Sequence, residues 1–199
     1  MILYACSTNP GKLREFTLAA QQSGITGLEL LPLPNIKEVT PPEETGATFQ
    51  ENAAIKALYY SGFTDELVFA EDSGLEVDAL GGEPGVFSAR YSGPDVTDEA
   101  NNQLLLKNLR HKLNRHGRFV CVIGVAKGGK LLTTVSGAVE GEILRAPQGS
   151  NGFGYDPLFF YPPLNQCFGE LTTEAKFEVS HRGKAVRALF DWLKRSAPR

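Results

Sequence analysis

Three short apolar runs and two amphipathic segments alternate along the first third of the chain. Residues 2–6, 28–33 and 67–70 are largely apolar and too short for typical helices, so they are predicted to be strands. Residues 10–24 and 48–62 lie between them and carry apolar positions at helical spacing. This β-α-β-α-β opening predicts an α/β fold.

The starts of both helices carry recognisable signals. Asn9 is a favourable N-cap residue, and Pro10 follows it at the first helical position. Gly24 is placed to end this helix. Thr48 and Glu51 have the spacing of a capping box at the start of the second helix.

The rest of the chain continues the α/β pattern. A helix is expected from near Thr97, and residues 119–126 and 131–139 are expected to form a hairpin around a Lys-Gly-Gly-Lys turn. A Gly-rich stretch then precedes the apolar residues 157–161. A last amphipathic helix is expected over 180–195.

Composition narrows the class of protein. With 199 residues, 42% hydrophobic and 22% charged, the chain can bury its own core, and residues 1–199 are predicted to be one domain in two lobes. The net charge of −3 gives no basic excess, so nucleic acid is not an expected partner. No apolar run is long enough for a membrane span, no signal-peptide pattern opens the chain, and the three cysteines lack metal-type spacing. We expect a cytoplasmic protein with free thiols.

Ser7 to Lys12, read S-T-N-P-G-K, lies between a strand and a helix N-terminus. The N–H groups at such an end favour an anion, and Lys12 adds a positive charge. The spacing of a Walker loop is absent. The segment is therefore either a phosphate-binding loop or an ordinary N-cap turn.

Glu71 and Asp72 directly follow the apolar run that ends at Ala70. Ligands of α/β sheets usually bind outside this end of a strand. A turn at 73–74 is expected to bring both carboxylates to one cleft, where they would suit Mg²⁺. A second acidic pair, at 43–44, precedes the second helix. The alternative is that these acids are merely solvated.

Two further segments carry polar or aromatic groups suited to a ligand. Phe153 has a glycine on each side, so a base could stack on its ring, or the segment could be a turn that holds a core aromatic. Lys176, His181 and Arg182 lie near the start of the last helix, where they favour an anionic or polar ligand unless the histidine is structural. All four places together supply what a nucleotide triphosphatase requires.

In these segments the chain resembles the inosine/xanthosine triphosphate pyrophosphatases, the non-canonical purine nucleotide family that includes the Ham1 proteins. Six motifs occur in family order over nearly the whole chain. They are S-T-N-P-G-K (7–12), E-E-T-G-A-T-F-Q-E-N-A (43–53), A-E-D-S-G-L-E-V-D-A-L-G-G-E-P-G (70–85), S-A-R-Y-S-G (88–93), G-F-G-Y-D-P (152–157) and S-H-R-G-K-A (180–185).

The resemblance implies a fold and an activity. The fold is α/β, with a mixed twisted central sheet flanked by helices and a nucleotide cleft between two lobes. The activity is Mg²⁺-dependent hydrolysis of ITP, dITP and XTP to the monophosphate and pyrophosphate, which keeps these nucleotides out of DNA and RNA. The family also implies a homodimer.

The resemblance further implies roles for individual residues. Asp72 would be the proton acceptor. Metal ligation is implied for Glu43 (or its neighbour Glu44), Glu71 and Asp72. Substrate binding is implied for Ser7, Thr8, Asn9, Pro10, Gly11, Lys12, Lys56, Ser73, Phe153, Gly154, Tyr155, Asp156, Lys176, His181 and Arg182.

Two positions depart from the family pattern. Bacterial relatives often have Thr-Gly-Asn in place of Ser7-Thr8-Asn9, so the approach to the backbone at Thr8 is tighter. They also often have two aspartates in place of Glu71-Asp72, which leaves open which carboxylates bind the metal directly.

Two other functions are compatible with parts of this pattern. A Maf-like pyrophosphatase for other modified nucleotides shares the general fold, but the G-F-G-Y-D-P and S-H-R-G segments argue against it. A non-catalytic nucleotide sensor would need the phosphate loop without the acids, whereas Glu71 and Asp72 are present.

Overall fold

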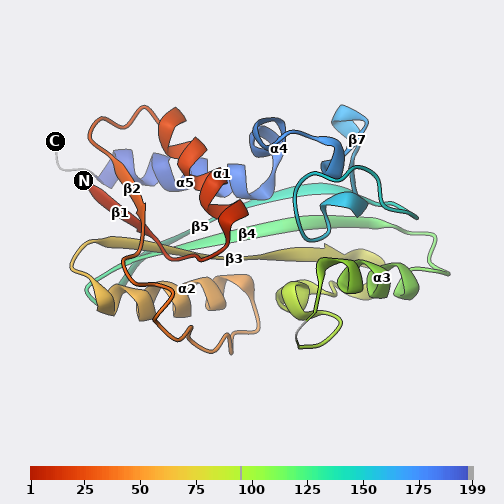
Figure 1. Cartoon of the computed structure of the whole chain (residues 1–199), viewed down its shortest axis with the longest axis horizontal. Coiled ribbons are helices and arrows are strands. Elements are labelled where there is room, and N and C mark those ends of the chain that lie inside the picture. The colour runs from red at the N-terminus through yellow and green to blue at the C-terminus, as the bar shows by residue number, and fades with distance from the viewer. Residues whose placement is uncertain (95, 197–199) are drawn as a thin grey trace. The chain divides into compact units, whose positions relative to one another are not determined.

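The elements of a computed structural model, which describes residues 1–94 and 96–196, follow the predicted α/β order (Figure 1). The strands are β1 (Ile2–Ala5), β2 (Glu29–Pro32), β3 (Leu67–Val77), β4 (His116–Lys127), β5 (Lys130–Ile143), β6 (Phe159–Tyr161) and β7 (Gln166–Cys167). The helices are α1 (Pro10–Gln22), α2 (Phe49–Tyr60), α3 (Asp98–Asn108), α4 (Thr173–Val179) and α5 (His181–Ser196). The short helix α4 and strand β7 were not predicted.

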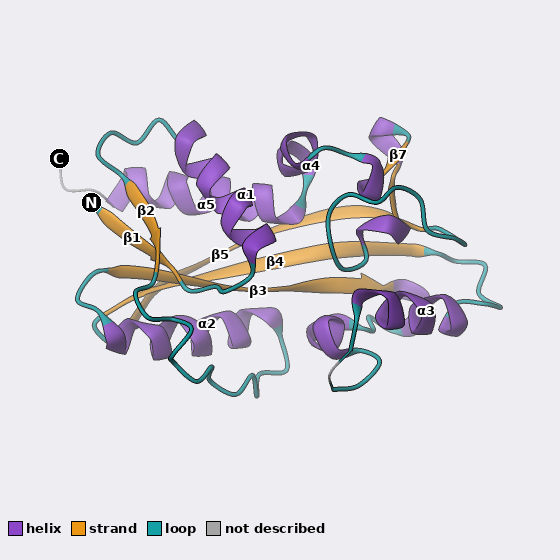
Figure 2. Ribbon diagram, in the orientation of Figure 1, coloured by secondary structure: helices purple, strands orange, loops and turns teal. Residues whose placement is uncertain are grey.

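The described strands form one seven-stranded sheet in the order β2-β1-β3-β4-β5-β6-β7, drawn in orange in Figure 2. Strand β1 pairs in parallel with β2 and β3, while β6 pairs antiparallel with β5 and β7. The sheet is therefore mixed, and the α/β fold class is confirmed. The predicted hairpin joins β4 to β5 through Gly128 and Gly129, whose φ values of 56° and 75° require glycine-like freedom.

Both predicted helix starts are confirmed. The Asn9 side chain accepts a hydrogen bond from the Lys12 N–H at 3.1 Å, and the Thr48 hydroxyl accepts one from the Glu51 N–H at 3.1 Å. The capping box differs in its second half, because the Glu51 carboxylate accepts from the N–H of Ala47 instead of that of Thr48.

The predicted end of the third strand at Ala70 is wrong. Strand β3 continues to Val77, so residues 71–74 are extended and no turn follows the acids. Leu75 and Val77 are fully buried beyond them, and this second apolar stretch keeps the chain in the sheet. Because successive residues of a strand face opposite sides, Glu71 and Asp72 do not point into one cleft as expected.

The chain divides into two compact units, in agreement with the two expected lobes. The described residues of unit 1 are 1–72, 121–137 and 181–196, and those of unit 2 are 73–94, 96–120 and 138–180. The nucleotide cleft stays a prediction. No helix in the described part of the chain is long and apolar enough to cross a membrane.

Each unit has its own apolar cluster. In unit 1, α1 and α5 lie on one face of the strands and α2 on the other (Figure 1). Buried residues on the α2 side include Leu33, Ile36, Ala57, Tyr60, Val68, Ala70 and Ala126. The cluster of unit 2 includes Leu75, Val77, Leu105, Leu109, Phe119, Val139, Ile143, Leu158, Phe159 and Phe168.

We expect Gly124→Ala to lower the free energy of unfolding by about 1–3 kcal/mol, because of overpacking. A Cβ atom at Gly124 would lie 2.6 Å from the carbonyl oxygen of Ala53 and 3.1 Å from the Cβ of Ala57, both in α2. Urea unfolding measures the change. The control is Gly62→Ala, where a Cβ meets nothing within 4 Å; an equal loss in both variants would contradict the packing argument.

Candidate functional site

The predicted phosphate-binding segment forms the connection from β1 to α1 in unit 1. The Ser7 hydroxyl accepts a hydrogen bond from the N–H of Asn9 at 3.2 Å, so the loop is shaped by its own side chains. Thr8, Asn9 and Pro10 are exposed. The start of α1 is thus open to a ligand, as an anion-binding helix end requires.

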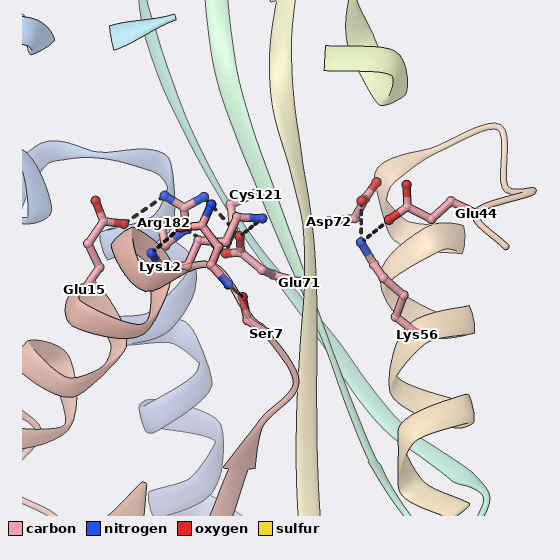
Figure 3. Close-up of polar contacts among 10 residues, drawn as sticks. Ser7, Lys12, Glu15, Glu44, Lys56, Glu71, Asp72, Cys121 and Arg182 are labelled. Carbon is pink, nitrogen blue, oxygen red and sulfur yellow. Dashed lines mark hydrogen bonds and ion pairs between the residues drawn. The ribbon is translucent and has the colours of Figure 1, made fainter. Parts of the chain in front are cut away.

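Glu71 and Asp72 belong to separate charge clusters, which Figure 3 shows on the two sides of β3. The side chain of Asp72 points toward α2 and lies against Lys56, whereas that of Glu71 lies against Arg182. Strand periodicity produces this separation.

Lys56 lies between two carboxylates in the cluster on the α2 side. Its ammonium nitrogen is 2.6 Å from Asp72 Oδ1 and 2.8 Å from Glu44 Oε1. The second carboxylate oxygen of Asp72 accepts a hydrogen bond from the Asn52 side chain at 3.4 Å. Glu43, the other member of its acidic pair, is exposed.

Burial makes Asp72 a stronger base than an exposed carboxylate. Burial raises the pKa of Asp72, and the charge of Lys56 only partly offsets this. Burial by itself lowers the pKa of Lys56, but the attractions and hydrogen bonds of Asp72 and Glu44 together outweigh it, so the pKa of Lys56 is raised. A carboxylate that is partly desolvated and adjacent to a fixed cation is suited to accept a proton from water.

The chemistry of these donors fits a magnesium ion. In the described residues no group of three or more His, Cys, Asp or Glu side chains could hold a metal. However, Glu44 and Asp72 converge on one cation, the ammonium of Lys56. Mg²⁺ commonly uses one or two carboxylates and completes its shell with water and phosphate oxygens. Two carboxylates are therefore enough in the presence of a phosphorylated ligand.

The second cluster is buried and centres on Glu71. Arg182 donates to both of its carboxylate oxygens, at 2.8 and 3.0 Å, and Lys12 lies 2.8 Å away. The Cys121 thiol donates to the same carboxylate at 3.2 Å. Arg182 also pairs with Glu15 of α1 at 2.8 Å. Arg182 thus ties α5 to both α1 and β3.

The charges of this cluster balance. Two carboxylates face two cations, which is what burial of charged groups requires. Burial alone would raise the pKa of Glu71, but the charges of Arg182 and Lys12 hold it well below its usual range. Glu71 is therefore ionised at neutral pH. Any stabilisation that comes from its lowered pKa is fully present above its ordinary pKa of 4.5 and is lost as the pH falls toward the lowered value of the folded protein.

The aromatic segment of unit 2 is held by a buried ion pair. Lys176 of α4 lies 2.6 Å from Asp156, and its ammonium sits 4.5 Å from the centre of the Phe153 ring. Asp156 also accepts the N–H of Phe153 at 2.9 Å. One carboxylate thus fixes both the ring and the cation above it.

Helix α3 also holds the aromatic segment, through hydrogen bonds to the backbone of Gly154. Asp98 accepts a hydrogen bond from the N–H of Gly154 at 2.6 Å, and Asn102 donates one to the Gly154 carbonyl at 3.0 Å. A cavity of about 580 Å³ adjoins this contact and is lined in part by Phe153. Tyr155 is buried, and its hydroxyl donates to the carbonyl of Ser88 at 2.8 Å.

The predicted residues fall into two groups, one in each unit. Unit 1 brings together Lys12, Glu71 and Arg182, and separately Lys56 with Asp72. His181 is buried at the start of α5. Unit 2 brings together Phe153, Asp156 and Lys176 and also contains Ser73. The individual ligand roles stay predictions.

Sequence reasoning missed several residues that position these groups, namely Glu15, Asn52, Asp98, Asn102 and Cys121. Two of them left a signal. Glu15 precedes Phe16 in the middle of a predicted helix, and both are buried. Asn52 likewise interrupts an otherwise apolar helix face and is fully buried. Buried polar groups need partners, so such positions mark hidden contacts.

The chain is similar over nearly its full length to known proteins. A family model described as the Ham1 family matches residues 3–192. A dITP/XTP pyrophosphatase of Acidobacterium capsulatum is 49% identical over 198 residues, covering 95% of this chain and 96% of that protein. Another, from an Exiguobacterium species, is 48% identical over 189 residues and 95% of both chains. The solved structure of a HAM1 protein from Coxiella burnetii has a TM-score of 0.88 at 36% identity, covering 98% and 100% of the two chains.

We expect Lys176→Met to lower the free energy of unfolding by about 3–5 kcal/mol, because Asp156 would keep a buried charge without its cation. The side chains of this pair are only 4% and 3% exposed. Urea unfolding measures the loss.

The matched control for Lys176→Met is Arg118→Met, also in unit 2. Arg118 pairs with Glu140 and Asp78 at 2.9 Å and with Glu76 at 3.5 Å, but all four side chains are 32–70% exposed. The control should lose less than about 1 kcal/mol. Similar losses in the two variants would show that burial does not set the strength of the Lys176 pair.

Proposed function

The chain belongs to the Ham1 family, and from this premise we propose that it hydrolyses non-canonical purine nucleoside triphosphates to the monophosphate and pyrophosphate. The substrate class is that of its relatives, which are named dITP/XTP pyrophosphatases. The observation that carries the proposal is the buried Asp72 carboxylate, held 2.6 Å from Lys56 and close to a second acid, Glu44. This cluster combines a base, a cation and a metal-binding pair of oxygens.

Asp72 is assigned the role of base. We propose that it orients a water molecule and accepts its proton as the water attacks the α-phosphorus. Lys56 holds the Asp72 carboxylate in place and offers positive charge to the phosphates. Lys12, at the open start of α1, is assigned to the triphosphate. Glu44 and Asp72 would hold Mg²⁺, whose chemistry is to neutralise charge on the pyrophosphate leaving group.

Base selection requires a donor opposite the 6-keto oxygen. Hypoxanthine and xanthine accept a hydrogen bond there, whereas adenine presents a 6-amino donor. A buried donor left unpaired by adenine can discriminate by roughly 10⁴-fold. We assign this donor, from the family resemblance, to the segment of His181 and Arg182. Phe153 offers a ring face for stacking.

We further propose that the enzyme depends on Mg²⁺ and acts as a homodimer in the cytoplasm. The pair of carboxylates around Lys56 supports the metal. The dimer rests on the family resemblance. The three cysteines are free thiols, as expected for a reducing compartment.

Separate incubation with ITP, XTP, dITP, ATP and GTP tests the activity, with pyrophosphate and orthophosphate both measured. We expect pyrophosphate from the first three in the presence of Mg²⁺ and none after chelation by EDTA. Orthophosphate as the first product would place the attack at the terminal phosphorus and overturn the mechanism. No release from any of the five would favour a sensor or a different substrate, and modified pyrimidine nucleotides would be the next substrates to assay.

Replacing the proposed base tests its role directly. Asp72→Asn keeps the size of the side chain and removes the proton acceptor, so kcat for ITP should fall roughly 100-fold or more. Asp65→Asn, an exposed acid of the same unit, is the control and should keep its kcat. A near-normal kcat in Asp72→Asn would remove Asp72 from the role of base.

A further inference from the structure

We propose that Glu71 is a positioning residue and not a metal ligand: it holds Lys12 and Arg182 in place beside the catalytic cluster. This inference rests on the proposed function, because Lys12 is assigned there to the triphosphate. It also separates two acids that are adjacent in the sequence and were expected to share one metal ion.

The side chains of Glu71 and Asp72 point in opposite directions. Residues 71 and 72 lie within the continuous strand β3, so they face opposite sides of the sheet. Asp72 joins Lys56 on the side of α2, and Glu71 contacts groups from α1 and α5 on the other side (Figure 3). A metal ion held by Glu44 and Asp72 would therefore lie on the side of β3 away from Glu71.

Both carboxylate oxygens of Glu71 already accept hydrogen bonds. Oε1 accepts from Lys12 at 2.8 Å and from Arg182 at 3.0 Å. Oε2 accepts from Arg182 at 2.8 Å and from the Cys121 thiol at 3.2 Å. With Glu71 only 5% exposed, a metal ion would have to displace a buried guanidinium or an ammonium to reach it.

Lys12 is the member of the cluster that reaches solvent. Its side chain is 24% exposed, compared with 3% for Glu71 and 2% for Arg182. Lys12 makes one ion pair with Glu71, whereas Arg182 binds Glu71 twice and Glu15 once. A phosphate group can thus attract Lys12 while Arg182 keeps its contacts.

Two ion pairs hold the start of α1 in place. Lys12 and Glu15 are three residues apart on the helix and share one side of its first turns. Lys12 binds Glu71 of β3, and Glu15 binds Arg182 of α5. Glu71 therefore sets where the open helix end presents Lys12, and its influence on phosphate binding is transmitted through Lys12.

Metal binding distinguishes a ligand from a positioning residue. Mn²⁺ is titrated into the protein without nucleotide and followed by electron paramagnetic resonance. We expect Glu71→Gln to keep the dissociation constant for Mn²⁺ within about threefold, while Glu44→Gln and Asp72→Asn weaken binding by roughly tenfold or more. A loss in Glu71→Gln as large as that in Glu44→Gln would overturn the proposal.

Binding of inorganic tripolyphosphate, measured by calorimetry, tests the action through Lys12. Lys12→Met and Glu71→Gln should each weaken binding by roughly tenfold, but the double variant should be little weaker than either one. If the losses of affinity in the two single variants multiply in the double variant, Glu71 does not act through Lys12. Arg14→Met removes an exposed cation next to the same turn and should leave the affinity within about twofold.

A second variant, which conserves the charge, tests the proposal if Glu71→Gln does not fold. Glu71→Asp keeps the negative charge and shortens the side chain by one carbon, so it moves the anchor of Lys12 without removing it. We expect unchanged Mn²⁺ affinity and about threefold weaker tripolyphosphate binding. Parent-like tripolyphosphate binding in a folded Glu71→Asp protein would overturn the positioning role. Neither measurement depends on turnover. If the protein releases no pyrophosphate, the proposed function is contradicted, but the positioning role of Glu71 can still be tested.

Discussion

The alternation of side chains along β3 is the constraint on which the charged part of unit 1 depends. A strand sends neighbouring residues to opposite faces, so two consecutive acids contact helices on opposite sides of the sheet. Asp72 meets α2 through Lys56, and Glu71 meets α1 and α5 through Lys12 and Arg182. The same strand therefore carries a carboxylate paired with Lys56 on one face and a carboxylate held by Lys12 and Arg182 on the other.

The two carboxylates differ in pKa because their surroundings differ. The burial of Asp72 raises its pKa, since Lys56 offsets the burial only in part. Glu71 is more deeply buried, yet two cations hold its pKa well below the usual range. Opposite shifts at adjacent residues are typical of sites where one acid exchanges protons and the other stays charged.

Local signals in the sequence were enough for most of the fold. Asn9, Thr48 and the Gly128–Gly129 turn set element boundaries through short-range hydrogen bonds or backbone freedom, and such signals are legible without the tertiary structure. The length of β3 could not be predicted from local signals, because the two acids interrupt the apolar run. The strand continues beyond them because Leu75 is buried in a second apolar cluster. Contacts such as that of Glu15 with Arg182, 167 residues apart, leave no local pattern beyond a charge among buried positions.

The order of segments in unit 1 has a consequence for synthesis on the ribosome. Glu15 and Glu71 belong to the first part of the chain, but Arg182, which pairs with both, lies 111 residues after Glu71. During translation both carboxylates emerge long before Arg182. Until α5 is made, Glu15 and Glu71 both lack their contact with Arg182, so the cluster that joins α1 to β3 is incomplete. Helix α5, which is synthesised last, therefore completes the contacts of α1 and β3, which are synthesised first.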